Sequence, residues 1–234
     1  MSLFRPASNL SVAVTICLLS FWGCTKNPEA PQPVIGTFSD TDGNVYHAVS
    51  IGTQVWMVEN LKTTRFNDGA AIPLVTDSGA WSALATPGYC WYGNDSATNK
   101  DVYGALYNWF AVNSGKLAPA GWHVPTDSEW TVLTNYLGGA SVAGGPLKEA
   151  GTAHWAFPNS GATNASGFTA LPGGYRNPNG AFFYLGHDGY WWSSTVYDSA
   201  DSWYRGMSYY GAANVGRQSY DNVYGLSVRC VRNP

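Results

Sequence analysis

The sequence has little charge. Of its 234 residues only 12% are Asp, Glu, Lys or Arg, and the formal net charge is −3 at pH 7. It contains no run of lysines or arginines, so it lacks the basic surface by which proteins bind nucleic acids. It also lacks paired histidines with metal-ligand spacing, a Gly-x-Ser-x-Gly elbow and a phosphate-binding loop. We therefore expect no nucleic-acid partner, no cofactor and no enzymatic activity.

Aromatic residues and glycines are abundant instead. Aromatic residues make up 15% of the chain, with 11 Trp and 15 Tyr, and there are 27 glycines. Low charge together with many aromatic residues is the opposite of the composition that keeps a chain disordered. The composition therefore predicts a compact fold, rich in glycine turns, with many rings in or near its surface.

The first 23 residues have the pattern of a bacterial lipoprotein signal peptide. Arg5 gives a positive start, residues 10–22 are mostly apolar, and Gly23 precedes Cys24. The apolar run is too short for a confident transmembrane helix. We expect Cys24 to be diacylated and to become the mature N-terminus, since two acyl chains suffice for stable anchoring in a membrane. The alternatives are cleavage of an ordinary secretory signal nearby and retention of the segment as a membrane anchor.

The rest of the chain divides into a tether and one domain. Residues 24–34 contain three prolines and almost no large apolar side chain, which predicts a semi-rigid spacer. Residues 35–233 show no repeat of fixed period and no second boundary. We therefore expect a single domain over 35–233, held off the membrane surface by the spacer.

Two main helices are predicted within this domain. Apolar residues at helical spacing predict one helix over residues 102–111. Thr126 and Glu129 have the spacing of a capping box, which predicts the start of a second helix that runs to Leu137. Alternating or aromatic segments predict short strands at residues 45–49, 54–58, 168–176, 181–185, 190–195, 202–208 and 225–231.

Six stretches resemble the Fibrobacter succinogenes major paralogous domain, a family of secreted and lipid-anchored bacterial proteins. They follow one another along the domain at residues 51–61, 89–92, 103–110, 121–130, 190–194 and 225–231. More distantly, residues 124–130 and 225–229 resemble the formylglycine-generating enzymes. These resemblances imply an α+β, C-type-lectin-like fold, in which two main helices pack on antiparallel sheet with long loops. They also imply an extracytoplasmic protein of the bacterial cell envelope, which the lipid would anchor in the outer membrane.

The same resemblances exclude two known activities. The formylglycine-generating enzymes use a close cysteine pair near the C-terminus, whereas only Cys230 lies in that region here. The calcium-binding motifs of sugar-binding C-type lectins are absent as well. Outside the leader and Cys24, the remaining cysteines are Cys90 and Cys230. An extracytoplasmic location permits a disulfide between them; two separate buried thiols are the alternative.

Two loops contain candidate polar ligands. Asn94, Asp95, Asn99 and Asp101 carry oxygen atoms of the kind that calcium prefers. The alternative is a polar loop in which Asp101 caps the helix that follows, and we favour that reading, with no metal bound. His187 and Asp188, between glycines, form either a site or a simple turn.

The C-terminal third carries the best binding candidates. Aromatic rings can stack on sugars or anchor a protein interface, and arginines can donate to hydroxyls or carboxylates. Core packing is the competing explanation for Trp191, Trp192 and Trp203. The candidate ligand-binding residues are Trp203, Arg205, Tyr209, Tyr210 and Arg217.

The sequence as a whole favours a non-enzymatic binding or adhesion module of the envelope. Its partners would be the membrane, through the lipid anchor, and a polysaccharide or an envelope protein as ligand. A structural surface protein without a small-molecule ligand is the alternative, and an enzyme of unrecognised type is a further one.

Overall fold

The computed structural model describes residues 1, 32, 34–211 and 213–233. The expected signal peptide and the lipidation site at Cys24 lie outside these residues. Within the described part, no helix is both long enough and apolar enough to cross a membrane.

The first sheet is built around an N-terminal hairpin. Strands β1 (Val34–Ser39), β2 (Val45–Ile51) and β3 (Gln54–Met57) pair antiparallel in sequence order. Gly52 makes the turn between β2 and β3 with φ of +61°, a conformation that glycine adopts without steric cost. The short strands β12 (Val231–Arg232) and β6 (Trp122–His123) complete the order β1-β2-β3-β12-β6.

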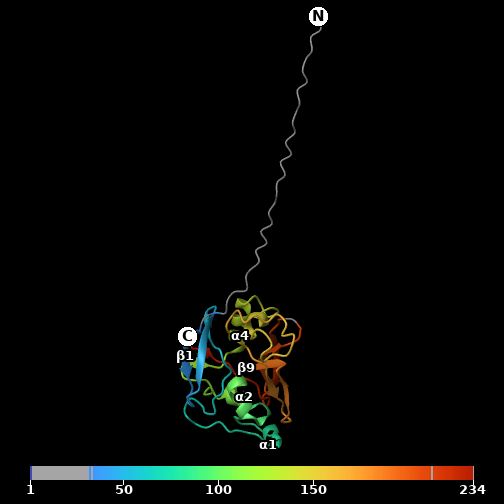
Figure 1. Cartoon of the computed structure of the whole chain (residues 1–234). Coiled ribbons are helices and arrows are strands. Elements are labelled where there is room, and N and C mark those ends of the chain that lie inside the picture. Colours follow the sequence, from blue (N-terminus) through green and yellow to red (C-terminus); the bar gives the residue numbers. More distant parts are fainter. Residues whose placement is uncertain (2–31, 33, 212, 234) are drawn as a thin grey trace.

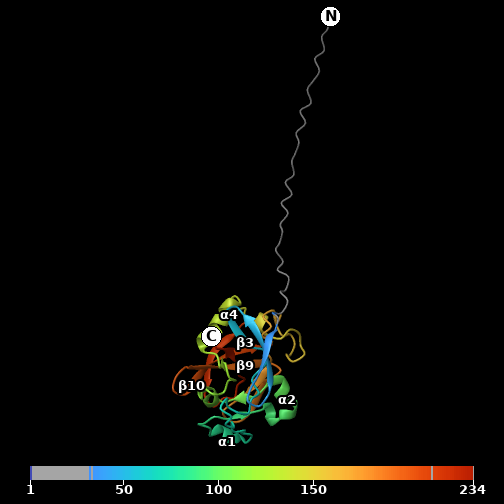
Figure 2. The same cartoon turned by 90° about the vertical axis from the view of Figure 1, so that its left-hand side faces the viewer.

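The second sheet comes from the C-terminal half of the chain. Its strand order is β11-β10-β9-β7-β8, with β7 parallel to β9 and the other pairs antiparallel. The strands span Gly173–Arg176 (β7), Phe182–Leu185 (β8), Asp188–Val196 (β9), Asp201–Ser208 (β10) and Gly216–Asp221 (β11). A third sheet pairs β4 (Tyr89–Cys90) with β5 (Leu106–Tyr107). Figures 1 and 2 show the two large sheets on different sides of the molecule, with α4 at one end and α1 at the other.

Short helices connect the sheets. They are α1 (Ser78–Ser82), the 3₁₀ helix η1 (Tyr92–Asn94), α2 (Ser96–Tyr103), α3 (Trp109–Asn113), α4 (Asp127–Tyr136) and α5 (Gly144–Leu147). The predicted capping box of α4 is confirmed. The amide of Glu129 donates to Thr126 Oγ1 at 3.2 Å, and the Thr126 amide donates to Glu129 Oε2 at 2.8 Å.

The expected α+β arrangement of two main helices on a sheet is wrong. The described residues form a mostly β fold, with twelve strands in three sheets and five short α-helices. The helix predicted over 102–111 does not form, because Gly104 breaks it with φ of +74°. A Cβ atom there would lie 2.8 Å from Asn60 Cβ and from the Leu61 carbonyl oxygen, so the chain turns at this point and continues into β5.

The C-terminal segment, residues 225–232, touches all three sheets. Its residues form bridges to Arg176 on β7, Tyr107 on β5 and Trp191 on β9. Further along, Val231 pairs with both Trp56 on β3 and His123 on β6. We call this segment the spine, because it joins sheets that make few other backbone contacts with each other.

Arg229 fastens the spine to its surroundings. Its guanidinium is fully buried and donates to Asn60 Oδ1 at 3.0 Å, to the Thr169 carbonyl at 2.7 Å and to the Phe168 carbonyl. Asn60 Oδ1 also accepts from Trp191 Nε1 at 2.9 Å. Burial lowers the pKa of the Arg229 guanidinium. The buried charge is thus held by oxygen atoms of loops and of one amide side chain.

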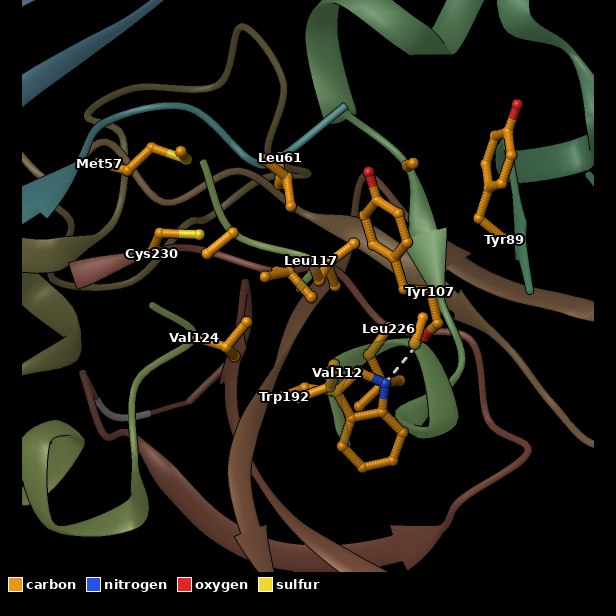
Figure 3. Packing of buried hydrophobic residues seen from close by; sticks show 14 of the residues in the cluster. Met57, Leu61, Tyr89, Tyr107, Val112, Leu117, Val124, Trp192, Leu226 and Cys230 are labelled. Carbon is orange, nitrogen blue, oxygen red and sulfur yellow. Dashed lines mark hydrogen bonds between the residues drawn. The ribbon is translucent and has the colours of Figure 1, made fainter. Parts of the chain in front are cut away.

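Two large apolar clusters lie on either side of the spine. One contains Trp192, Tyr107 and Leu226, and in Figure 3 the Trp192 indole donates to the Tyr107 carbonyl at 2.8 Å. The other contains Trp56, Trp130 and Trp191. Trp191 and Trp192 are fully buried, so core packing is confirmed for these two rings.

The expected disulfide between Cys90 and Cys230 is absent from the structure, which has two free, buried thiols there. The two residues pack into different clusters: Cys90 lies with Trp81 and Leu106, and Cys230 with Met57 and its neighbours (Figure 3). Burial raises the pKa of the Cys90 thiol to about 12 and raises that of Cys230 as well. Both cysteines therefore act as small apolar core residues.

Replacing Arg229 tests the spine. We expect Arg229→Met to lower the free energy of unfolding by about 3 kcal/mol, because the buried acceptors of the guanidinium lose their donor. Urea denaturation measures the change. Arg232→Met, at an exposed position of β12, is the control and should change stability by less than about 0.5 kcal/mol. Equal stability of the two variants would contradict this account of the spine.

Candidate functional site

The second sheet carries a hollow on one face, above its strand β10. Side chains alternate along a strand, so Tyr204, Gly206 and Ser208 share this face. In the register, Gly206 lies opposite Tyr190 of β9 and Gly216 of β11. Two of the three positions in this cross-strand row have no side chain. The missing side chains leave a hollow of about 150 Å³.

Hydrogen bonds fix the walls of the hollow. The Tyr204 hydroxyl donates to Gln218 Oε1 at 2.7 Å, and the Tyr190 hydroxyl donates to Asp188 Oδ2 at 3.0 Å. Ser208 and Asn214 line the remaining rim. The hollow is thus preformed, with aromatic walls and a polar rim, the combination typical of ligand sites in proteins.

Asp188 has unused bonding capacity. Its Oδ1 atom is buried and accepts no hydrogen bond from any described residue. A buried acceptor without a donor costs about 1–3 kcal/mol, and native proteins seldom retain one without a reason. Asp188 therefore brings a carboxylate with an unpaired, buried oxygen to the lining of the hollow.

More tyrosines extend the aromatic wall away from the hollow. Tyr220 stacks on Tyr204 with ring centroids 4.3 Å apart and on Tyr224 at 4.1 Å. Tyr175 contacts Tyr190 edge-on at 5.1 Å. Burial, followed by the neighbouring tyrosines, raises the pKa of Tyr175 to about 12. Burial also raises the pKa values of Tyr190 and Tyr204. These hydroxyls remain protonated donors at neutral pH.

Three exposed rings lie on segments near the hollow, and one of them, Tyr184, contacts the ring of Tyr175 at 5.7 Å. Phe157 is 84% exposed, Tyr184 is 51% exposed and Tyr210 is 71% exposed. Tyr184 belongs to strand β8, and Phe157 and Tyr210 belong to loops. Their segments bond to one another: the Ala156 amide donates to the Gly186 carbonyl at 2.6 Å, and the Ser160 amide to the Tyr209 carbonyl at 3.0 Å. We call these three rings the platform.

Four of the five predicted ligand-binding residues are occupied with other contacts. Arg205 and Arg217 both bind Asp127 at the start of α4, at 2.7 and 3.0 Å. The Arg217 guanidinium also lies 3.5 Å from the ring centroid of Trp203. Tyr209 packs on the second apolar cluster and meets His187 edge-on.

The fifth, Tyr210, is exposed as expected. Its amide donates to Ser208 Oγ at 3.3 Å, which places it next to the hollow. Trp203 is only partly buried, between Arg217 and the ring of Tyr197, so core packing describes it less well than Trp191 and Trp192.

The weak calcium candidates do not converge. Asp95, rather than Asp101, caps helix α2, where it accepts from the Thr98 amide at 3.1 Å. Asp101 lies within α2 and binds Lys62 at 3.0 Å. Asn94 donates to the Thr76 carbonyl, and Asn99 to the Tyr92 carbonyl. Within the part of the chain that the structure describes, no three His, Cys, Asp or Glu side chains form a metal-binding group.

Sequence reasoning missed most of the residues that line the hollow. Of the pair His187 and Asp188, left open as a site or a turn, Asp188 lines the hollow. Tyr204 belongs to the aromatic cluster of the C-terminal third, but the sequence does not single out Tyr190, Gly206 or Gly216. The alternation Tyr-x-Gly-x-Ser at residues 204–208 was a visible signal. Its meaning depends on the register of β9 and β11, which the sequence does not state.

The tyrosines of the hollow predict a loss of stability at alkaline pH. Their pKa values are raised in the folded protein, so folding opposes ionisation. The contribution of these tyrosines to the free energy of unfolding is intact below their pKa in the unfolded chain, about 10. It is lost as the pH rises above that pKa. We expect the urea concentration at half-unfolding to decrease as the pH is raised from about 10 to about 12. Absorbance at 295 nm should follow the ionisation of the tyrosines. Tyr136→Phe on α4 is the control. Tyr220→Phe should lower the pKa of Tyr175, because it removes a neighbouring phenol. A flat midpoint across this range would contradict the prediction.

One comparison with known proteins finds a match. The model of the Fibrobacter succinogenes major domain matches residues 49–232, which is well over half of the chain. No curated protein and no solved structure matches. The matched range includes both the spine and the hollow. The chain therefore belongs to the Fibrobacter succinogenes major domain family.

Proposed function

We propose that this chain is a lipid-anchored, non-enzymatic binding module of the bacterial cell envelope, with a polysaccharide or a partner protein as its ligand. The hollow above Gly206 and Gly216 is the observation that carries the proposal. It combines aromatic walls with a polar rim that includes the Asp188 carboxylate. Such features favour recognition of a ligand that presents both an apolar surface and hydrogen-bond donors.

The size of the hollow supports a ligand larger than the hollow itself. Sites that enclose a small molecule usually measure about 300–1,000 Å³. The hollow, at about 150 Å³, holds one small group. A ligand bound there is best understood as one unit or side chain of a polymer that continues over the surrounding surface. That fits a module that adheres to a polymer or to a protein surface.

The expected location supports the same proposal. Cys24 follows a sequence typical of lipoprotein signal peptides, and residues 24–34 would serve as a spacer between a membrane and the domain. We place the protein in the outer membrane of the envelope. A tethered domain with a rigid, exposed site can reach ligands near that membrane.

Filling the hollow tests the binding function. A Cβ atom at Gly206 would lie 3.4 Å from Tyr204 and 3.5 Å from Tyr190, which is ordinary contact, so Gly206→Val should fold. We expect this variant to lose at least tenfold in binding to insoluble polysaccharides or to isolated envelope proteins in a pull-down. Ser39→Val, at an exposed position of β1, is the matched control. Unchanged binding by Gly206→Val would exclude the hollow as the site.

Removing the lipidation site tests the anchor. We expect Cys24→Ser to move the protein from the membrane fraction to the soluble fraction, because the acyl chains attach through this thiol. Cys17→Ser, within the leader, should leave the distribution unchanged. Detergent partitioning of the two variants decides the question, and membrane association of Cys24→Ser would exclude the lipid anchor.

A further inference from the structure

The hollow and the platform adjoin each other. Asp188 and Ser208 line the hollow; the platform residue Tyr184 lies on β8, and Tyr210 lies in the loop directly after Ser208. One bond ties the loop after β10 to the turn before β9: the Tyr209 amide donates to the His187 carbonyl at 2.8 Å. Within its own loop, the Tyr210 amide donates to Ser208 Oγ at 3.3 Å. A ligand that leaves the hollow across its Asp188–Ser208 rim therefore meets the platform.

Packing accounts for little of the platform: Tyr184 contacts the ring of Tyr175 at 5.7 Å, but its ring stays half exposed. All three are more than half exposed, so they gain little from burial. Tyr184 also has φ of +63°, a conformation that costs a bulky residue about 1–3 kcal/mol and that glycine or asparagine adopts more easily. Strain of this kind gathers at functional sites. The platform is held in place by its backbone bonds, and its rings are presented to solvent.

The chemistry of this surface fits a chain of sugar rings. Each sugar unit has an apolar C–H face and an edge of hydroxyl groups, so one unit can meet both an aromatic ring and a polar rim. The platform supplies rings, and the hollow supplies the Asp188 carboxylate and the amide of Gln218. A protein partner would need about 800 Å² of contact on each side. The three rings instead come from three separate segments, and the exposed polar residue His187 lies in the turn next to them.

We propose that the ligand is a polysaccharide, with one sugar unit in the hollow and the next units stacked on Tyr184, Tyr210 and Phe157. This inference rests on the proposed binding function and makes it specific. The hollow would bind a single sugar unit, and the platform would make the affinity depend on the length of the oligosaccharide. The affinity for oligosaccharides must then rise with their length, and the platform must supply that rise.

The test uses the full-length protein and soluble β-1,4-linked oligomers of glucose, N-acetylglucosamine and xylose, from one to six units. We expect the affinity for one of these series to rise with length. The double variant Phe157→Ala/Tyr210→Ala should lose at least tenfold for the six-unit oligomer and little for the shortest oligomer that binds. Tyr136→Ala/Val142→Ala removes two side chains of similar exposure elsewhere and is the matched control.

A second variant separates a ligand contact from a structural role. Asparagine tolerates the backbone conformation of Tyr184, so Tyr184→Asn should keep or raise the free energy of unfolding while it lowers the affinity for the six-unit oligomer. Wild-type affinity in the platform variants would overturn the inference and leave the binding function intact. Failure of the unmodified protein to bind any oligomer would overturn the inference too. If the unmodified protein still captured an envelope protein and Gly206→Val abolished that capture, the binding function would survive with a protein ligand.

Discussion

The fold depends on a charged side chain that is buried without a carboxylate partner at bonding distance. Arg229 places its guanidinium among the oxygen atoms of Asn60, Phe168 and Thr169, and so ties the spine to two loops. The spine in turn pairs with strands of all three sheets. Breaking such a contact leaves several buried acceptors unpaired, so the cost exceeds that of any single hydrogen bond. The sheets are joined through this one polar centre and the apolar clusters around it.

Other buried cations hold the remaining loops in a similar way. Arg176 donates to the carbonyls of Val75, Thr76 and Gly180, and its guanidinium lies over the ring of Trp81. Lys148 donates to the carbonyls of Ser160 and Ser208, and burial lowers its pKa. A fold with long irregular segments has many backbone carbonyls that no strand or helix satisfies. A few long cationic side chains donate hydrogen bonds to these carbonyls. This role explains why several cations of a chain with low charge are buried.

This rigidity bears on the surface as well. Lys148 fixes the Ser208 carbonyl next to the hollow, while the walls of the hollow are fixed by the bonds of Tyr190 and Tyr204. The cavity itself arises from two glycines that share a cross-strand row, so it requires no movement to open. A preformed site loses little conformational entropy on binding. The proposed ligand path therefore begins at side chains fixed by hydrogen bonds and continues over segments bonded to the second sheet.

Local signals in the sequence determined the local structure. The capping box of Thr126 and Glu129 started α4, and Gly52 formed the turn between β2 and β3, because both depend on neighbours within a few residues. The expected helix over 102–111 failed where Gly104 meets Asn60, a contact between distant parts of the chain. The arginines predicted to meet a ligand bind Asp127 instead, and the cysteines predicted to pair lie in different clusters. Only the tertiary structure decided the hollow, because register brings Gly206, Gly216 and Tyr190 from three strands into one row.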